Sequence, residues 1–261
     1  MAVGDLKIDA RRKKILEILN RDGQVRVTQL SEELGATTVT IRSDLDALEQ
    51  NGYLERIQGG AVQTVKNYYN LEFLRRKQEN SDVKRGIASS AADIIQDGDT
   101  ILINSGTTTY YTAIELKKHK NLNIVTNSLM VAMELGDYPT FRVILLGGEI
   151  NAQYSFTYGS DAQEQLRRYK ADYAILSMDG ICLEGGLTTY HAEEAVINRI
   201  MMERAKKTMI VADRRKLGRE GFLFVSDLSN VDILVTDREA DAQFVTKLQE
   251  MGAEVVYGKE E

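Results

Sequence analysis

The sequence predicts an α/β protein with a small, mainly helical N-terminal domain and a larger domain built on a mainly parallel sheet. Its 261 residues are enough for two domains. Residues 1–64 hold three amphipathic helical stretches and one hairpin pattern, whereas short apolar runs alternate with helical stretches from residue 100 onward. Such alternation is typical of a parallel sheet that is covered on both faces. We assign the polar residues 65–82 to a linker and residues 83–261 to the second domain.

The composition is that of a soluble globular protein, with 43% hydrophobic and 28% charged residues. No apolar run reaches the roughly 18 residues of a membrane helix, and the N-terminus lacks a signal-peptide pattern. Cys182 is the single cysteine, which excludes a disulfide framework, and two histidines are too few for a histidine-rich metal centre. We therefore expect a cytoplasmic protein that has no membrane segment, no metal and no cofactor.

Three helices are predicted in the N-terminal domain. The first follows a basic run at residues 11–14, and the second begins near Thr28. Only residues 35–36 separate the second helix from the third, at residues 37–50. The third helix has one apolar stripe that faces the core, made of Ile41, Leu45 and Leu48. Two helices joined by so short a turn are typical of a helix-turn-helix.

The residues after the third helix read as a wing. Residues 53–57 alternate like a strand, residues 58–60 turn, and residues 61–64 return. The outward face of the third helix carries small hydroxyls and a guanidinium, which can reach base edges and phosphates. We expect the following residues to contact double-stranded operator DNA: Arg11, Lys13, Thr37, Thr38, Thr40, Arg42, Ser43, Arg56 and Gln58. Three helices can also form a protein–protein module, but the wing and the polar outward face favour DNA.

The net charge of −6 does not contradict this interpretation, because the charge is unevenly divided. Residues 1–66 hold ten Lys and Arg against ten Asp and Glu, so the whole excess of negative charge lies in the remainder. Local fields rather than the overall charge attract phosphates.

At these residues the chain resembles the DeoR family of bacterial transcriptional regulators. The resemblance rests on the run Thr40-Ile41-Arg42-Ser43-Asp44-Leu45, followed by Leu48, Gly52, Leu54 and Gly59-Gly60-Ala61. Two positions depart from the common pattern of the family, which favours a second Arg at Ser43 and a His at Gln58. The resemblance implies a winged helix-turn-helix that binds an operator.

The second domain alternates strands and helices. The predicted strands lie at residues 100–104, 122–126, 141–146, 173–177, 209–212, 233–236 and 254–257. The predicted helices include residues 84–95, 128–136, 193–206 and 241–251, and one through Tyr111 and Leu116. Ligands of open α/β sheets bind beyond the carboxyl ends of the strands, so the loops that follow them are the candidate binding loops.

The loop at residues 104–109 favours an anion. Gly106 allows close approach of the backbone, and the hydroxyls and amides at the start of the next helix suit a phosphate. A hydroxyl-rich helix cap without a ligand is the alternative.

Three further loops carry candidate ligand groups. Gly147-Gly148 follows a strand with Glu149 beside it, although this pair can also be a simple turn. Asp179 stands at a strand end as a polyol acceptor or as the cap of a turn, with Glu194 further along the chain. Residues 212–218 place three cations after a strand, either as counter-charge for a phosphate or as a solvated basic loop.

These loops extend the resemblance to the sensor domain of the DeoR family, which is similar in fold to sugar-phosphate isomerases and coenzyme A transferases. The resemblance implies a phosphorylated sugar or related metabolite as effector. It implies a phosphate site at Ser105, Gly106, Thr107 and Thr108, and further pocket residues at Gly147, Asp179, Glu194 and Lys216. The family usually has Asp at Asn104 and Ser at Arg215.

The sequence therefore predicts a transcriptional regulator, most simply a repressor of a carbohydrate operon that a phosphorylated sugar releases from its operator. A sugar-phosphate isomerase with a DNA-binding head is the alternative, because Asp179, Glu194 and Lys216 are suitable acid–base types. A coenzyme A transferase would need a Glu nucleophile, and no feature singles one out. No catalytic residue is assigned. Because one small head makes few DNA contacts, we expect a homo-oligomer, either a dimer or a tetramer.

Overall fold

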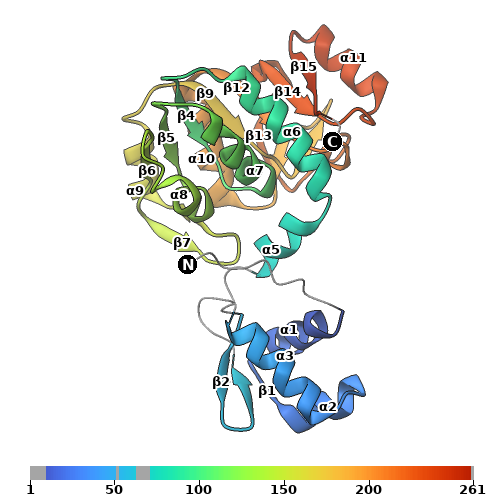
Figure 1. Cartoon of the computed structure of the whole chain (residues 1–261). Helices are drawn as coiled ribbons and strands as arrows, with labels where there is room; N and C mark the ends of the chain where they lie inside the picture. Colours follow the sequence, from blue (N-terminus) through green and yellow to red (C-terminus); the bar gives the residue numbers. More distant parts are fainter. Residues whose placement is uncertain (1–9, 51–52, 63–70, 260–261) are drawn as a thin grey trace. The chain divides into compact units, whose positions relative to one another are not determined.

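The computed structural model describes residues 10–50, 53–62 and 71–259. The chain divides into an N-terminal unit, Met1–Glu72, and a C-terminal unit, Phe73–Glu261. Figure 1 shows their elements along the chain. Gly52, the end of the returning wing strand at residues 63–64 and the first part of the expected linker lie outside the described residues.

The N-terminal unit contains the three predicted helices and the predicted hairpin. Its elements are α1 (Ala10–Asp22), β1 (Gln24–Arg26), α2 (Val27–Leu34), α3 (Thr38–Gln50), β2 (Glu55–Ile57) and β3 (Gly60–Val62). Strand β1 was not predicted, because three residues are too few to show an alternating pattern. It pairs antiparallel with β3, so the sheet order is β1-β3-β2.

One hydrophobic core holds this unit together. Ile41, Leu45 and Leu48 of α3 are fully buried, as the apolar stripe predicts, and pack with Ile15 of α1 and Leu30 of α2. At Gly60 a Cβ atom would meet the Val25 carbonyl oxygen at 2.0 Å. The close approach of β1 to the hairpin therefore requires glycine there.

The C-terminal unit is built on seven parallel strands, which confirms the predicted parallel α/β domain. The strands are β4 (Thr100–Ile103), β5 (Asn123–Thr126), β6 (Arg142–Leu145), β9 (Ala171–Leu176), β12 (Ala205–Val211), β14 (Ile233–Thr236) and β15 (Glu254–Tyr257). Their order in the sheet is β15-β14-β12-β9-β4-β5-β6.

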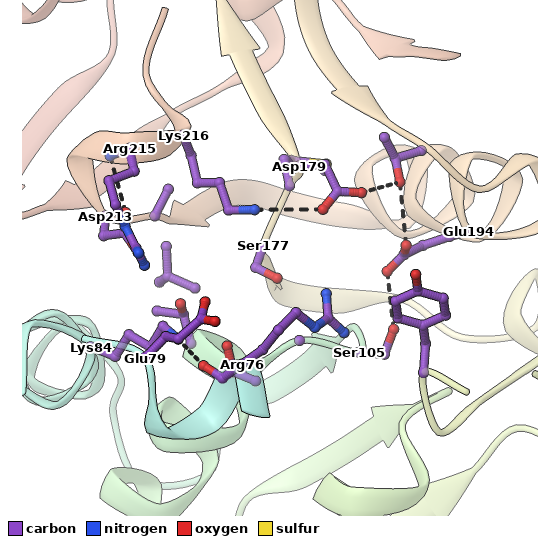
Figure 2. A pocket seen from close by; sticks show the side chains of 18 residues that line it. Arg76, Glu79, Lys84, Ser105, Ser177, Asp179, Glu194, Asp213, Arg215 and Lys216 are labelled. Atoms are coloured by element: carbon purple, nitrogen blue, oxygen red, sulfur yellow. Dashed lines mark hydrogen bonds and ion pairs between the residues drawn. The ribbon is translucent and has the colours of Figure 1, made fainter. Parts of the chain in front are cut away.

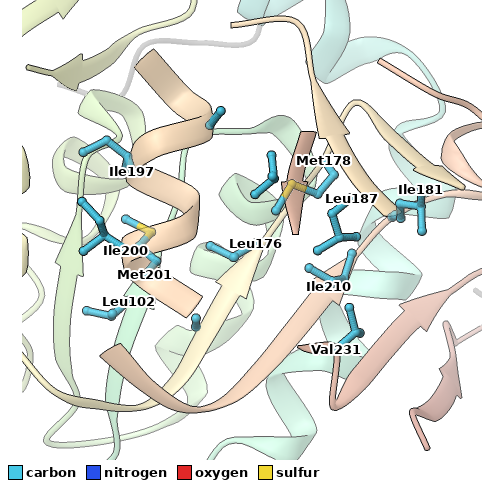
Figure 3. Close-up of a cluster of buried hydrophobic side chains, with 14 of the residues drawn as sticks. Leu102, Leu176, Met178, Ile181, Leu187, Ile197, Ile200, Met201, Ile210 and Val231 are labelled. Atoms are coloured by element: carbon cyan, nitrogen blue, oxygen red, sulfur yellow. The ribbon is translucent and has the colours of Figure 1, made fainter. Parts of the chain in front are cut away.

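Helices cover both faces of this sheet, because alternate residues of its strands point to opposite sides and both sets are apolar. One buried cluster joins Ile101, Ile103 and Ile175 to helices α6 (Ser81–Ile94), α7 (Thr107–Glu115) and α8 (Leu129–Leu135). The other joins the remaining face to helices α9 (Ser160–Leu166), α10 (Ala192–Arg204) and α11 (Ala242–Glu250). Figure 3 shows the second cluster around Leu102, Leu176 and Ile210.

Two small antiparallel sheets accompany the main sheet. They consist of β7 (Glu149–Asn151) with β8 (Phe156–Tyr158), and of β10 (Gly180–Cys182), β11 (Gly186–Thr189) and β13 (Leu223–Ser226). Neither was predicted, since these five short strands lack the nearly continuous apolar runs that marked the strands of the main sheet.

Several boundaries differ from expectation. The helix predicted to reach residue 206 ends at Arg204, because Ala205 already pairs with Ala171 as the first residue of β12. Helix α5 (Leu71–Gln78) lies inside the segment expected as a linker, and Phe73 in it is 1% exposed. No helix among the described residues is long and apolar enough to cross a membrane.

Candidate functional site

A pocket in the C-terminal unit lies at the carboxyl ends of three neighbouring strands, β4, β9 and β12. The ends of these strands and the loops that leave them supply residues 105–108, 177–179, 211–213 and 215–216 to its lining. Figure 2 shows these side chains turned toward one another. Parallel strands bring their carboxyl ends to one edge of the sheet, so loops far apart in the sequence meet there.

The N-terminus of α7 faces this pocket. Gly106 occupies its N-cap position, and no side chain caps the helix. The first amides of α7 and the positive end of its dipole are therefore left for an anion. A Cβ at Gly106 would meet the Ser177 hydroxyl at 2.1 Å, so only glycine lets the ends of β4 and β9 approach this closely.

Asn104, where the family pattern usually has Asp, connects two strand ends. Its buried amide nitrogen donates to the Ser177 carbonyl and to Asn198 Oδ1, both at 2.9 Å, while its oxygen accepts from the Ser177 amide at 3.0 Å. An ionised Asp could not donate the first two hydrogen bonds. Asn104 thus holds the floor of the site together rather than facing a ligand.

Two carboxylates share one hydroxyl in the pocket. Thr189 Oγ1 lies 2.9 Å from Asp179 Oδ2 and 3.3 Å from Glu194 Oε2. Ser105 donates to the other oxygen of Glu194 at 3.0 Å. Burial raises the pKa of Glu194 to about 7, and the negative charge of Asp179 adds to this effect. Glu194 therefore changes its protonation near neutral pH.

We expect the buried carboxyl group of Glu194 to make the C-terminal unit less stable as the pH rises from 5 to 8. Because its pKa is raised from 4.5 to about 7, the neutral form is favoured by folding. The stabilisation is fully present below pH 4.5 and is lost as the pH rises to about 7. Relative to Glu194→Gln, the wild type should lose about 2 kcal/mol of unfolding free energy between pH 5 and pH 8. Urea denaturation at both pH values measures this, and an identical pH dependence in the two proteins would contradict it.

The three consecutive cations of the 212–218 loop have different partners. Lys216 lies 3.6 Å from Asp179, and Arg215 lies 3.0 Å from Asp213. Both line the pocket, whereas Arg214 points elsewhere and pairs with Asp237. The basic run is thus neither wholly solvated nor wholly directed at the site.

Helices α5 and α6 close the other side of the pocket. Arg76 comes from α5 and Lys84 from α6, and the turn between the two helices contributes Glu79. Lys84 is 4% exposed and donates to the carbonyl of Arg76, and burial lowers its pKa to about 8. The guanidinium carbon of Arg76 lies 4.8 Å from the ring centroid of Tyr154, another lining residue.

Most of the predicted effector residues meet in this pocket. Its lining includes Ser105, Gly106, Thr107, Thr108, Asp179, Glu194 and Lys216. Gly147 is not part of the lining, and its amide donates to the side chain of Gln165 at 3.0 Å. Sequence reasoning missed the lining residues Arg76, Glu79, Lys84, Tyr154 and Thr189. Two sequence features could have pointed to these residues. Arg76 belongs to a basic run in the segment assigned to the linker, and Thr189 closely follows a pair of glycines at residues 185–186.

In the N-terminal unit, the outward face of α3 is a candidate nucleic-acid interface. Arg42 and Ser43 are exposed, and the exposed fraction of Val39 is 71%. Within the described part of the chain, the side chain of Arg42 has no hydrogen bond or ion pair, so its guanidinium can bind a base or a phosphate. Thr38 is half-buried at the start of the helix. Thr37 accepts from the Thr40 amide at 3.2 Å and bonds the Thr40 hydroxyl at 2.9 Å, which fixes this first turn.

Arg11, one of the expected DNA contacts, is engaged inside the unit. Arg11 and Arg12 both hold the carboxylate of Asp44, at 2.5 and 3.0 Å, and Asp44 is 2% exposed. Burial opposes ionisation of Asp44, but the hydrogen bonds from the two guanidinium groups outweigh it and lower its pKa. Lys13, which is exposed, is the better placed of the two predicted contacts on α1.

Arg56 of the wing is also partly engaged. It donates to the Gly60 carbonyl at 3.0 Å and lies 3.1 Å from Asp46 of α3. Gln58 is exposed at the tip of the hairpin, beside Gly59, whose φ of +78° permits the turn. Arg56 therefore contacts α3 through a partly exposed ion pair and is only partly available to DNA.

Comparison with known proteins gives one match for the N-terminal unit and one for the C-terminal unit. Residues 11–66 match the DeoR-like helix-turn-helix domain, and residues 79–238 match the DeoR C terminal sensor domain. The HTH-type transcriptional repressor CsqR of Escherichia coli K12 is 30% identical over 261 residues, which is 100% of both chains. The glycerol-3-phosphate regulon repressor of the same organism is 32% identical over 89% of this chain and 92% of its own.

A more distant likeness is to a solved structure, ribose 5-phosphate isomerase A of Methanocaldococcus jannaschii. The TM-score is 0.39 with 18% identity, over 53% of this chain and 55% of the isomerase. The two domain matches together account for most of the described residues, and the regulators match the chain over nearly its whole length. The chain therefore belongs to the DeoR family of transcriptional regulators.

Proposed function

We propose that this protein represses a carbohydrate operon and leaves its operator when the pocket of the C-terminal unit binds a phosphorylated sugar. The observation that carries the proposal is the pocket itself. It combines an uncapped helix N-terminus at Gly106 with the cation Lys216 and the carboxylates Asp179 and Glu194. The name of one relative, a glycerol-3-phosphate regulon repressor, fits the same class of effector.

The two ends of such a ligand need different chemistry, and the pocket supplies both. Backbone amides at a helix N-terminus, together with a lysine, bind a phosphate. Carboxylate oxygens accept hydrogen bonds from sugar hydroxyls. The paired groups Asp179 and Glu194, already bridged by Thr189, form the acceptor end. A phosphorylated polyol satisfies both ends at once.

The test is a titration of the protein, bound to a duplex from its own promoter region, with a panel of phosphorylated sugars. We expect one member to reduce operator affinity by about 5- to 150-fold, which corresponds to a coupling of about 1–3 kcal/mol. Operator DNA must weaken ligand binding by the same factor. Thr107→Ala and Lys216→Ala should lose the response but keep operator affinity, because both residues lie only in the pocket.

Arg214→Ala is the matched control for Lys216→Ala, since Arg214 belongs to the same loop but does not line the pocket. It should respond like the wild type. Unchanged DNA affinity across the whole panel would refute the proposed effector class. An equal response in all variants would instead place the effector site elsewhere.

The proposal includes the absence of enzymatic turnover. Isomerisation needs a base and a polarising group beside adjacent substrate carbons. Here Asp179 contacts Thr189 and Lys216, an arrangement that suits an acceptor for sugar hydroxyls. Purified protein should not isomerise sugar phosphates at enzyme-like rates in a coupled assay. Steady activity that disappears in Asp179→Asn would overturn this part of the proposal.

We further propose that the working unit is a dimer or a tetramer. One N-terminal unit offers a short recognition helix and a small wing, which bury too little DNA surface for a selective operator. Two such units on a two-fold axis would read inverted half-sites roughly 34–36 Å apart, or a multiple of that distance. Sedimentation velocity should show an oligomer both free and on DNA. A monomer in both states would refute the idea.

A further inference from the structure

One cation in the pocket, Arg76, stacks on an aromatic ring but has no hydrogen-bond or ion-pair partner among the described residues. Lys216 forms an ion pair with Asp179, Arg215 forms one with Asp213, and the ammonium group of Lys84 donates to a backbone carbonyl. Among the described residues, Arg76 forms no hydrogen bond or ion pair through its side chain, and its Nε is buried without a partner. Buried donors in folded proteins nearly always have a partner, so this Nε is available to a group bound in the pocket.

The environment of Arg76 holds its guanidinium in place for such a group. The plane rests against the ring of Tyr154, at 4.8 Å between the guanidinium carbon and the ring centroid. In Figure 2 the side chain extends from α5 across the pocket toward Ser105, at the N-terminus of α7. A fixed guanidinium opposite a helix N-terminus presents donors from two sides, which is the arrangement that a phosphate with its several oxygens requires.

Helix α5 is attached to the helix that forms this anion site. Phe73 packs edge-on against Tyr110 of α7, with ring centroids 5.5 Å apart. The hydroxyl of Tyr111 donates to the Lys77 carbonyl at 3.1 Å. In the sequence, α5 follows directly on residues 63–70, which come from the N-terminal unit. A ligand that contacts Arg76 therefore acts on the first described helix after the wing.

We propose that Arg76 binds the phosphate group of the effector together with the N-terminus of α7, so that ligand binding fixes the position of α5. This inference rests on the proposed function and adds a residue and a route of communication to it. The phosphate then contacts both the N-terminus of α7 and Arg76 of α5, and so links the two helices. Ligand binding therefore restricts the motion of α5. Because α5 is covalently joined to residues 63–70, this restriction also acts on the point where the chain leaves those residues.

The experiment uses the full chain and inorganic phosphate, the part that all phosphorylated sugars share. Calorimetry of wild type, Arg76→Gln, Arg76→Lys and Arg75→Gln gives the affinity for phosphate. Arg75→Gln is the matched control, because Arg75 is the neighbouring cation on α5, is about half exposed (53%) and does not line the pocket. Amide hydrogen exchange of residues 71–79 with and without phosphate reports the ordering of α5.

We expect Arg76→Gln to weaken phosphate binding by about 10- to 100-fold, since it removes charge-assisted hydrogen bonds. Arg76→Lys should recover part of the loss, and Arg75→Gln should bind like the wild type. Phosphate should protect α5 from exchange in the wild type and in Arg75→Gln but not in Arg76→Gln. Unfolding temperature and operator affinity should be unchanged in all variants, which separates ligand binding from a structural role.

Equal phosphate affinity in Arg76→Gln and the wild type would overturn the inference, as would phosphate binding without protection of α5. Failure of phosphate to bind any of the proteins would also overturn it. If a phosphorylated sugar nevertheless releases the operator in these cases, the proposed function stands without the inference. If no phosphorylated sugar does so, the proposed function fails as well.

Discussion

Replacement of Asp44 by Ala is expected to destabilise the N-terminal unit by about 2 kcal/mol, because it removes charge-assisted hydrogen bonds from a buried carboxylate, while the remaining guanidinium groups are partly exposed to water. Asp44 is 2% exposed and holds two guanidinium groups, those of Arg11 and Arg12. Asp44 thereby stabilises the packing of α1 against α3. Since its pKa is lowered below the ordinary 3.8, this stabilisation is present at neutral pH and is lost only as the pH falls through the lowered pKa.

Hydrogen exchange of the buried amides of α3 in the full chain measures this loss of stability. Asp46→Ala is the matched control, because Asp46 lies on the same helix but is 57% exposed, so its ion pair with Arg56 contributes little. Operator binding should fall with the folded fraction in Asp44→Ala. Wild-type protection in that variant would show that the two arginines are satisfied by water.

Arg42→Ala is expected to weaken operator binding by about 1–3 kcal/mol, or roughly 5- to 150-fold, if the guanidinium reads a base edge. Arg42 is exposed on the outward face of α3, and within the described residues nothing competes for its donors. Its removal therefore costs DNA contacts without affecting the fold. A fluorescence titration with operator and with unrelated duplex should show a loss of preference for the operator.

Lys13→Ala provides the contrasting case. Lys13 is exposed on α1, and a phosphate contact there should weaken binding to every duplex about equally and reduce the dependence on salt. Arg42→Ala and Lys13→Ala thus distinguish contacts with base edges from contacts with phosphates. If neither substitution changed binding at low salt, the assignment of α3 and α1 to the DNA interface would be wrong.

The large elements could be predicted because their patterns are long or strongly apolar. Runs such as residues 100–103 and 233–236 are nearly continuous apolar segments, as buried parallel strands require. The stripe Ile41, Leu45 and Leu48 specified the core face of α3 for the same reason. Short strands such as β1 and β7 escaped prediction because three residues show no period, and their pairing partners define them.

The site could be predicted only where its residues follow strands. The loops after β4, β9 and β12 are visible as glycines and polar groups behind apolar runs, and the structure brings them together. The roles of Arg76 and Asp44 escaped prediction because they depend on packing. Arg76 lies on a helix in a polar segment, and Asp44 has the sequence context of a surface charge, since its contacts with Arg11 and Arg12 form only in the folded unit.

The strand order of the main sheet also sets the order in which this protein can be assembled on the ribosome. Strand β4 is internal to the sheet, and β5 and β6 follow it outward on one side, whereas its other neighbour, β9, begins only at residue 171. Until that strand has been synthesised, the apolar segment Thr100–Ile103 presents an open edge, the kind of surface that recruits other chains. The N-terminal unit has its own core and is complete long before. Nascent chains interrupted between β6 and β9 are therefore the ones most in need of a chaperone.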